Sequence, residues 1–269
     1  MVVKAGYDKK NESKINAVEM RLLHSMCGVS RKERCRNSDV RKRCSLKEDV
    51  MTRVERAPSN HGGGEITERA CYESLERLGL EYIDLYLIHW PGAGSIPAAD
   101  KRNAELRDST WGTLVDIYKE GRFKAIGVSN YTERHLKELM AKDYGVSPAV
   151  NQVEWHPFYY QPELLKYSQD NDIVLQAYCS LGGTSVNDKS LLNHPTVVNI
   201  ANKLNVANGQ VLLAWALQQG VAIIPKASSV THIKNNINLN FKIPEEDVIQ
   251  LNKLSINKKK YAWDPNTVY

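Results

Sequence analysis

The sequence of 269 residues lacks several features that define well-known classes of protein. It has no run of about 18 apolar residues, which argues against a membrane-spanning helix and a membrane partner. Its N-terminus has no apolar core of the kind found in secretory signals. Its five cysteines are odd in number and form no C-x-x-C pair, which argues against a disulfide scaffold or a zinc ribbon. These absences predict a reduced, cytoplasmic protein.

Charge is distributed unevenly along the chain. Residues 1–60 hold 15 Lys and Arg against 8 Asp and Glu, whereas the rest of the chain holds 21 against 23. With 42% apolar and 25% charged residues, the overall composition is that of an ordinary globular protein. We therefore divide the chain into a basic segment, residues 1–64, and a near-neutral globular domain, residues 65–269.

The globular domain alternates amphipathic helices with short apolar strands. Apolar residues at helical spacing predict a helix at 66–79, which Gly79 ends. The stretch 82–88 is mostly apolar and stops at His89-Trp90-Pro91, which predicts a strand buried on both faces. The same patterns predict further helices at 104–120, 132–142, 162–170 and 208–219, and further strands at 123–128, 149–153, 173–178 and 221–225.

This alternation implies parallel strands joined by right-handed crossovers. It fits either an open doubly wound sheet or a TIM-type (β/α)8 barrel. No G-x-G-x-x-G motif follows any predicted strand, which argues against a Rossmann-type sheet. Each predicted strand ends instead in polar side chains, at the end where a barrel gathers its active site, so we favour the α/β barrel. The polar strand ends are His89, Ser129 with Asn130, Gln152, Tyr178 and Lys226.

Four stretches of the domain resemble motifs of the aldo-keto reductase family, in the family's order and spacing. They are YIDLYLIHWP at 82–91, GRFKAIGVSNY at 121–131, NQVEWHPFYYQ at 151–161 and AIIPKASSVTHIKNN at 222–236. The resemblance covers about residues 65–255. It implies a (β/α)8 barrel that binds NADP(H) without a Rossmann domain. It also implies the reduction of a small aldehyde or ketone to an alcohol by hydride transfer.

The resemblance assigns roles to the two residues that follow the first predicted strand. His89 resembles the family's active-site histidine, which orients the substrate carbonyl by a hydrogen bond, and Trp90 is the matching substrate contact. A histidine at a strand end is often satisfied by backbone groups alone. The adjacent Trp90-Pro91 makes us favour the catalytic role for His89.

The next strand ends resemble the part of the family's site that holds the nicotinamide. Ser129, Asn130 and Gln152 resemble the residues that bind its carboxamide, a group that needs both donors and acceptors. Ser129 or Asn130 could instead cap the following helix. Tyr178 resembles the aromatic side chain that stacks on the nicotinamide ring, with a core tyrosine as the alternative.

Lys226 begins a stretch that resembles the family's adenosine-phosphate motif. A cation after the last strand, followed by hydroxyls and helix N-terminal amides, attracts an anion. Here Ala227 replaces the usual serine, and His232 replaces the arginine that clamps the 2′-phosphate. Because a mostly neutral imidazole replaces a permanent charge, we expect a weakened preference for NADP over NAD. The candidate phosphate ligands are Lys226, Ser228, Ser229, His232 and Asn236.

The predicted strands account for five of the eight in a barrel. In the family, the first three carry a tyrosine proton donor with its lysine and aspartate, and residues 8–64 show neither the strand patterns nor the motifs. The sequence therefore predicts an incomplete barrel whose first three strands are missing, preceded by a basic N-terminal extension. Catalysis would then be impaired, and the alternative is a catalytically dead relic that binds the dinucleotide without turnover.

Residues 9–57 resemble a stretch near the C-terminus of reverse-transcriptase polyproteins from non-LTR retrotransposons. This predicts a chimaeric chain. The basic cluster at 31–43 could contact nucleic-acid phosphates, which would make this part a nucleic-acid-associated fragment. We favour a solvated, disordered arm over that alternative. No feature of the sequence specifies an oligomeric state.

Overall fold

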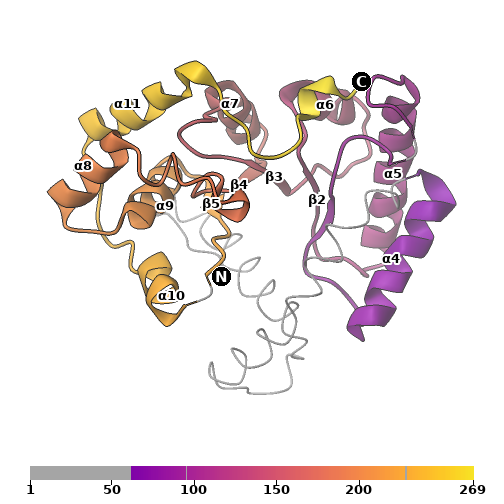
Figure 1. The fold of residues 1–269 in the computed structure, drawn as a ribbon. Coiled ribbons are helices and arrows are strands. Elements are labelled where there is room, and N and C mark those ends of the chain that lie inside the picture. The colour runs from indigo at the N-terminus through magenta and orange to yellow at the C-terminus, as the bar shows by residue number, and fades with distance from the viewer. Residues whose placement is uncertain (1–61, 95, 228) are drawn as a thin grey trace. The chain divides into compact units, whose positions relative to one another are not determined.

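The computed structural model describes residues 62–269 except Ser95 and Ser228 (Figure 1). The resemblance over residues 9–57 and the basic cluster at 31–43 lie outside the described residues and stay predictions. The described residues form two compact units. The first unit comprises residues 62–151 and 265–269, and the second unit comprises residues 152–264.

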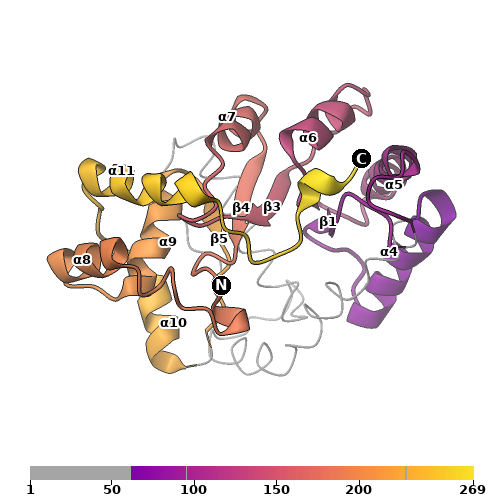
Figure 2. The same cartoon turned by 45° about the horizontal axis from the view of Figure 1, so that its top comes forward.

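The first unit places helices against two parallel strands. Its elements are α4 (Gly64–Leu78), β1 (Tyr86–Ile88), α5 (Arg102–Lys119), β2 (Ile126–Ser129), α6 (Glu133–Met140), the start of β3 (Val150–Glu154) and the short η4 (Pro265–Thr267). Strand β1 runs parallel to β2, with Tyr86 opposite Ile126 and Ile88 opposite Val128. Helix α4 lies beside α5, which packs against β2 (Figures 1 and 2).

Local chemistry explains where these helices begin and end. Helix α4 ends at Gly79, whose φ of 63° is left-handed, as the sequence predicts. Helix α6 begins with a capping box, because the Thr132 hydroxyl accepts from the His135 amide and the His135 ring accepts from the Thr132 amide. Helix α5 buries Trp111 and Leu114, which form the core of this unit with the fully buried β2.

The second unit starts within β3 and continues through two more strands. Its elements are α7 (Pro162–Asp170), β4 (Val174–Tyr178), η2 (Thr184–Val186), α8 (Pro195–Leu204), α9 (Asn208–Gln218), β5 (Ala222–Ile223), α10 (Val230–Ile237), α11 (Glu245–Lys253) and η3 (Leu254–Asn257). The strand order is β3-β4-β5, and β4 runs parallel to β5. Helix α9 is buried along most of its length, with α8 beside it and α11 beside α8 (Figure 2).

The five predicted strands and the five predicted helices are all present in the described residues. Helices α8 and α11 were not predicted. The interpretation of 82–88 as a strand buried on both faces is wrong, because β1 covers only Tyr86–Ile88 and, of these three residues, only Ile88 is buried. Among the described residues β1 pairs with β2 alone. No helix between residues 62 and 269, among those described, has the length and apolarity to cross a bilayer.

Gly127 fixes how closely β2 approaches its neighbours. A Cβ atom at this position would lie 2.5 Å from the Val150 carbonyl oxygen and 2.9 Å from Leu87 Cδ2. The backbone oxygen cannot move without disturbing the strand pairing. The close packing of β2 therefore requires glycine here.

We predict that Gly127→Ala lowers the free energy of unfolding by about 2–3 kcal/mol, because the added methyl group overlaps main-chain atoms. Urea denaturation followed by circular dichroism measures the change. Gly209→Ala is the matched control, since its Cβ would meet only Leu181 side-chain atoms at 3.6 Å and beyond within a helix that favours alanine. Equal stability of Gly127→Ala and wild type would contradict the packing argument.

Candidate functional site

In the first unit, the carboxyl ends of β1 and β2 bring three of the predicted site residues together. Asn130 follows β2 with a left-handed φ of 64°, a conformation that asparagine tolerates better than most residues. Its Nδ2 donates to the His89 carbonyl oxygen at 2.9 Å and to Ser129 Oγ at 3.1 Å. The capping alternative for Ser129 and Asn130 is wrong, because Thr132 caps α6. Asn130 thus fixes the backbone of the predicted catalytic histidine.

Two buried polar residues of α5 hold the loop that follows His89 and Trp90. Arg107 Nη1 donates to the Pro91 carbonyl oxygen at 3.0 Å. Asn103 accepts from the Ala93 amide and donates to the Pro97 and Ala98 carbonyl oxygens, each at 2.9 Å. Sequence reasoning missed both residues. The available signal was their spacing of four along α5, which places them on the face that buries Trp111 and Leu114.

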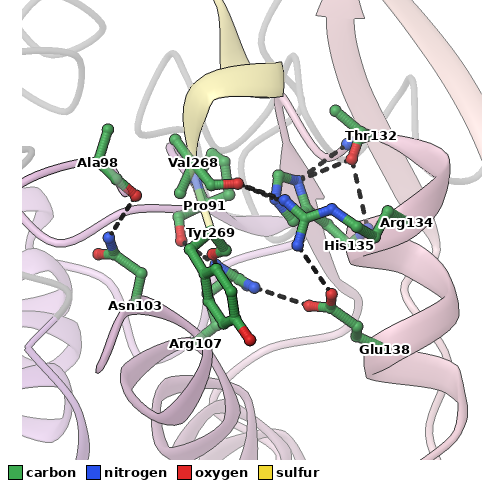
Figure 3. Close-up of polar contacts among 10 residues, drawn as sticks. All are labelled: Pro91, Ala98, Asn103, Arg107, Thr132, Arg134, His135, Glu138, Val268 and Tyr269. Atoms are coloured by element: carbon green, nitrogen blue, oxygen red, sulfur yellow. Dashed lines mark hydrogen bonds and ion pairs between the residues drawn. The ribbon is translucent and has the colours of Figure 1, made fainter. Parts of the chain in front are cut away.

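Arg107 belongs to a cluster that also holds the segment Val268–Tyr269 (Figure 3). Its Nη2 donates to Glu138 Oε2 at 2.7 Å and its Nη1 to the Tyr269 carbonyl oxygen at 2.5 Å. Arg134 donates to the Val268 carbonyl oxygen and pairs with Glu138 Oε1 at 2.9 Å. The cluster joins α5, α6, the loop after β1 and residues 268–269 within one unit (Figure 3).

His135 is the neutral member of this cluster. Burial is the largest cause that lowers the pKa of His135, to about 4, and the positive charge of Arg107 is the second. Its Nδ1 lies 3.2 Å from the Thr132 amide, which places the ring proton on Nε2, 3.2 Å from the Val268 carbonyl oxygen. The imidazole therefore serves as a hydrogen-bonding spacer between α6 and residue 268 at neutral pH.

In the second unit, Gln152 and Tyr178 lie on neighbouring strands. Gln152 Nε2 donates to Gln176 Oε1 at 2.6 Å, which fixes the predicted carboxamide ligand against β4. Tyr178 ends β4, and its carbonyl oxygen accepts from the Trp155 amide at 3.2 Å. Burial, with a smaller contribution from Glu154, raises the pKa of Tyr178, so its ring is a neutral surface.

Two of the predicted phosphate ligands, Ser229 and His232, lie at the start of α10, and Asn236 lies near its end. Ser229 is the N-cap, and its Oγ accepts from the His232 amide at 3.2 Å. Helix α10 contains no acidic residue, and Lys226 lies in the segment between β5 and this helix. Asn236 is buried and His232 is exposed, whereas Ser228 lies outside the described residues. A helix N-terminus with a nearby lysine and no acidic neighbour along the helix suits an anion.

A second buried charge, Glu154 at the end of β3, was missed by sequence reasoning. Its Oε1 accepts from His156 Nε2 at 3.0 Å and from the Tyr261 amide at 2.6 Å. Its Oε2 accepts from Lys260 Nζ at 3.0 Å and from the Ala262 amide at 3.1 Å. Burial alone would raise the pKa of Glu154, but these donors outweigh it and lower the pKa to about 2. Glu154 therefore fastens residues 260–262 to the strand.

Parallel strands joined by helices place the described residues in the α/β class of folds. No group of three His, Cys, Asp or Glu side chains suited to a metal ion occurs among the described residues. The model of the Aldo/keto reductase family matches residues 43–256. The chain belongs to this family.

Individual relatives agree with the family match. The chain is 39% identical over 196 residues to the uncharacterized oxidoreductase YtbE of Bacillus subtilis (strain 168), covering 72% of this chain and 64% of that protein. It is 40% identical over 198 residues to glyoxal reductase of the same organism, covering 73% and 66%. The chain thus spans about two thirds of the length of these curated relatives.

A solved structure shows the same fold. The crystal structure of an aldo-keto reductase from Bombyx mori, in complex with NADP, superposes with a TM-score of 0.65 at 30% identity. The match covers 73% of this chain and 65% of that one. The parallel α/β architecture of the described residues is therefore that of solved aldo-keto reductases.

We predict that acid weakens the fold through Glu154. The folded pKa of about 2 lies below the ordinary value of 4.5, so the ionised carboxylate stabilises the fold above about pH 4.5. This contribution, about 3 kcal/mol, is lost as the pH falls from about 4.5 toward 2. In Glu154→Gln the free energy of unfolding is lower at neutral pH and changes less across this window, as measured by urea titrations.

Glu163→Gln is the matched control, because this exposed acidic residue lies on α7 of the same unit. It should follow the wild-type curve. A Glu154→Gln variant with the same acid dependence as wild type would show that another carboxyl group governs this window.

Proposed function

We propose that this chain binds NADP(H) and reduces a small aldehyde or ketone to an alcohol by hydride transfer. The observation that carries the proposal is the fixed position of His89 at the carboxyl ends of β1 and β2, where Asn130 holds its carbonyl oxygen. Family membership and the similarity to a glyoxal reductase and to an NADP-bound reductase support it.

The residues of each unit have the chemistry that parts of the cofactor require. In the second unit, Lys226 and the first amides of α10 provide positive potential for the adenosine phosphate. Tyr178 provides an aromatic face and Gln152 an amide for the nicotinamide. In the first unit, Ser129 and Asn130 provide further polar groups beside His89. When bound, the cofactor supplies the hydride.

His89 acts on the substrate in this proposal. Its imidazole donates a hydrogen bond to the carbonyl oxygen, which orients the carbonyl carbon and draws electron density from it as the hydride arrives. Trp90, the next residue, provides an apolar wall that excludes water from the carbonyl. Both side chains follow directly on a strand whose pairing to β2 is fixed, so their backbone is preorganised.

Binding without turnover is the second candidate function. The family's tyrosine, lysine and aspartate have no matching positions in the four motifs between residues 82 and 236. An incomplete barrel of this kind would bind the dinucleotide and lack the proton donor. Mixing the protein with NADPH and 4-nitrobenzaldehyde distinguishes the two: consumption of NADPH above background supports the reductase, and fluorescence quenching without consumption supports the binding protein.

We predict that His89→Ala lowers kcat/KM for 4-nitrobenzaldehyde by about 100-fold, because the carbonyl loses its hydrogen-bond donor. The dissociation constant of NADPH should change little, as measured by quenching of protein fluorescence. His89→Gln, which keeps a donor, should recover part of the loss. Full activity of His89→Ala would show that His89 takes no part in the reaction.

We also predict that Lys226→Met weakens NADPH binding about tenfold, because the phosphate loses its nearest predicted cation. The matched control is Lys166→Met, an exposed lysine of the same unit that pairs with Asp170. His232→Arg should strengthen NADPH relative to NADH binding, since arginine restores a permanent charge on the exposed start of α10. Unchanged NADPH affinity in both Lys226→Met and His232→Arg would place the phosphate elsewhere.

A further inference from the structure

We propose that Arg107 is a positioning residue for this reduction and that residues 268–269 are the segment through which it acts. The inference rests on the proposed function and adds a specificity element to it. Arg107 and Tyr269 together hold the carbonyl oxygens of Pro91 and Ala98, in the segment that follows His89 and Trp90 (Figure 3). In this proposal, the segment held by Arg107 and Tyr269 sets where Trp90 lies relative to the carbonyl substrate.

The backbone on both sides of Trp90 is anchored by side chains. Asn130 Nδ2 holds the carbonyl oxygen of His89 at 2.9 Å, and Arg107 Nη1 holds that of Pro91 at 3.0 Å. Trp90 lies between these two anchors. The peptide group before Trp90 and the peptide group after Pro91 are both held, so the short stretch between them has little freedom to shift, and removing one anchor releases it.

Tyr269 joins both ends of the loop. Its carbonyl oxygen accepts from the same Arg107 Nη1 that holds Pro91, and its amide donates to the Ala98 carbonyl oxygen at 2.8 Å. Asn103 donates to the same Ala98 oxygen and to that of Pro97. Tyr269, which lies beyond η4, is therefore linked to Pro91 through Arg107 and to Ala98 directly.

Side-chain packing links this segment to Trp90 as well. A Cβ atom on Gly92 would lie 3.3 Å from Val268 Cγ1 and 3.4 Å from Trp90 Cδ1. The absence of a side chain at Gly92 thus brings Val268 and the Trp90 ring near the same point. Arg134 and His135 hold the Val268 carbonyl oxygen, which keeps the Val268 side chain in place (Figure 3).

The charge of Arg107 makes this arrangement specific. Its side chain is 8% exposed, so the guanidinium requires partners for its donors. Glu138 supplies the countercharge at 2.7 Å from Nη2. The other guanidinium nitrogen, Nη1, donates to the carbonyl oxygens of Pro91 and Tyr269. A planar fork with fixed donor directions satisfies these partners in one geometry, and a lysine cannot reach all three at once.

The test compares five variants: Arg107→Ala, Arg107→Lys, a chain that stops after Thr267, the combination of Arg107→Ala with that shortened chain, and the control Arg69→Ala. Arg69 lies in the same unit with its side chain 74% exposed, beside Glu73. For each variant we would measure kcat and KM with 4-nitrobenzaldehyde, the dissociation constant of NADPH, and amide hydrogen exchange across residues 92–98.

We expect Arg107→Ala and the shortened chain to raise KM for the aldehyde by about 10- to 100-fold, while NADPH affinity stays within about twofold. Exchange should accelerate in residues 92–98 and stay unchanged in β1 and β2. Arg107→Lys should recover part of the KM, and Arg69→Ala should behave as wild type. Combining Arg107→Ala with the shortened chain should cost less than the sum of the two single changes, because both remove the contact between Arg107 Nη1 and the Tyr269 carbonyl oxygen.

Two outcomes overturn the proposal: normal KM and exchange in a folded Arg107→Ala variant, or equal losses of aldehyde and NADPH binding. If Arg107→Ala does not fold, the shortened chain and Arg107→Lys decide by the same criteria. If the wild-type chain consumes no NADPH, the proposed function fails. Hydrogen exchange in residues 92–98 then still decides whether Arg107 and residues 268–269 position the loop.

Discussion

The structure of the first unit depends on one buried guanidinium. Arg107 is removed from water on the inner face of α5, and an isolated charge in that position would be strongly unfavourable. Its donors therefore need Glu138 on one side and main-chain oxygens on the other. Because these partners come from α6, from the loop after β1 and from the segment beyond η4, one electrostatic requirement fixes three separate pieces of chain.

A buried charge also holds the second unit together, and there the charge is negative. Glu154 is 1% exposed and gathers His156, Lys260 and two amides, Tyr261 and Ala262, around its carboxylate. In both units a buried charge thus holds the chain that follows α11, residues 260–262 in one and 268–269 in the other. Exposed ion pairs contribute little to such fixation, whereas a buried ion leaves few alternative geometries.

Hydrophobic periodicity predicted five strands and five helices of this fold, though not α8 or α11, because it reflects burial along one chain. It failed for β1, whose burial depends on which strands flank it. The polar strand ends were predicted as a set, yet the donation from Asn130 to the His89 carbonyl was not, since it requires the left-handed backbone at residue 130. Arg107 and Glu154 were missed because a charged residue in a helix or at a strand end usually faces solvent.

The two kinds of contact in the proposed site differ in what they can select. Around His89, donors and acceptors with fixed directions hold individual peptide groups, so small displacements of a substrate carbonyl are penalised. At the start of α10, positive potential comes from backbone amides and one nearby lysine, which attract any phosphate. In the proposed site, distinguishing NADP from NAD requires a permanent charge aimed at the 2′-phosphate, and His232 stands where the family has an arginine. In the proposed function, selectivity would therefore rest more on the contacts around the carbonyl than on those around the cofactor's phosphate.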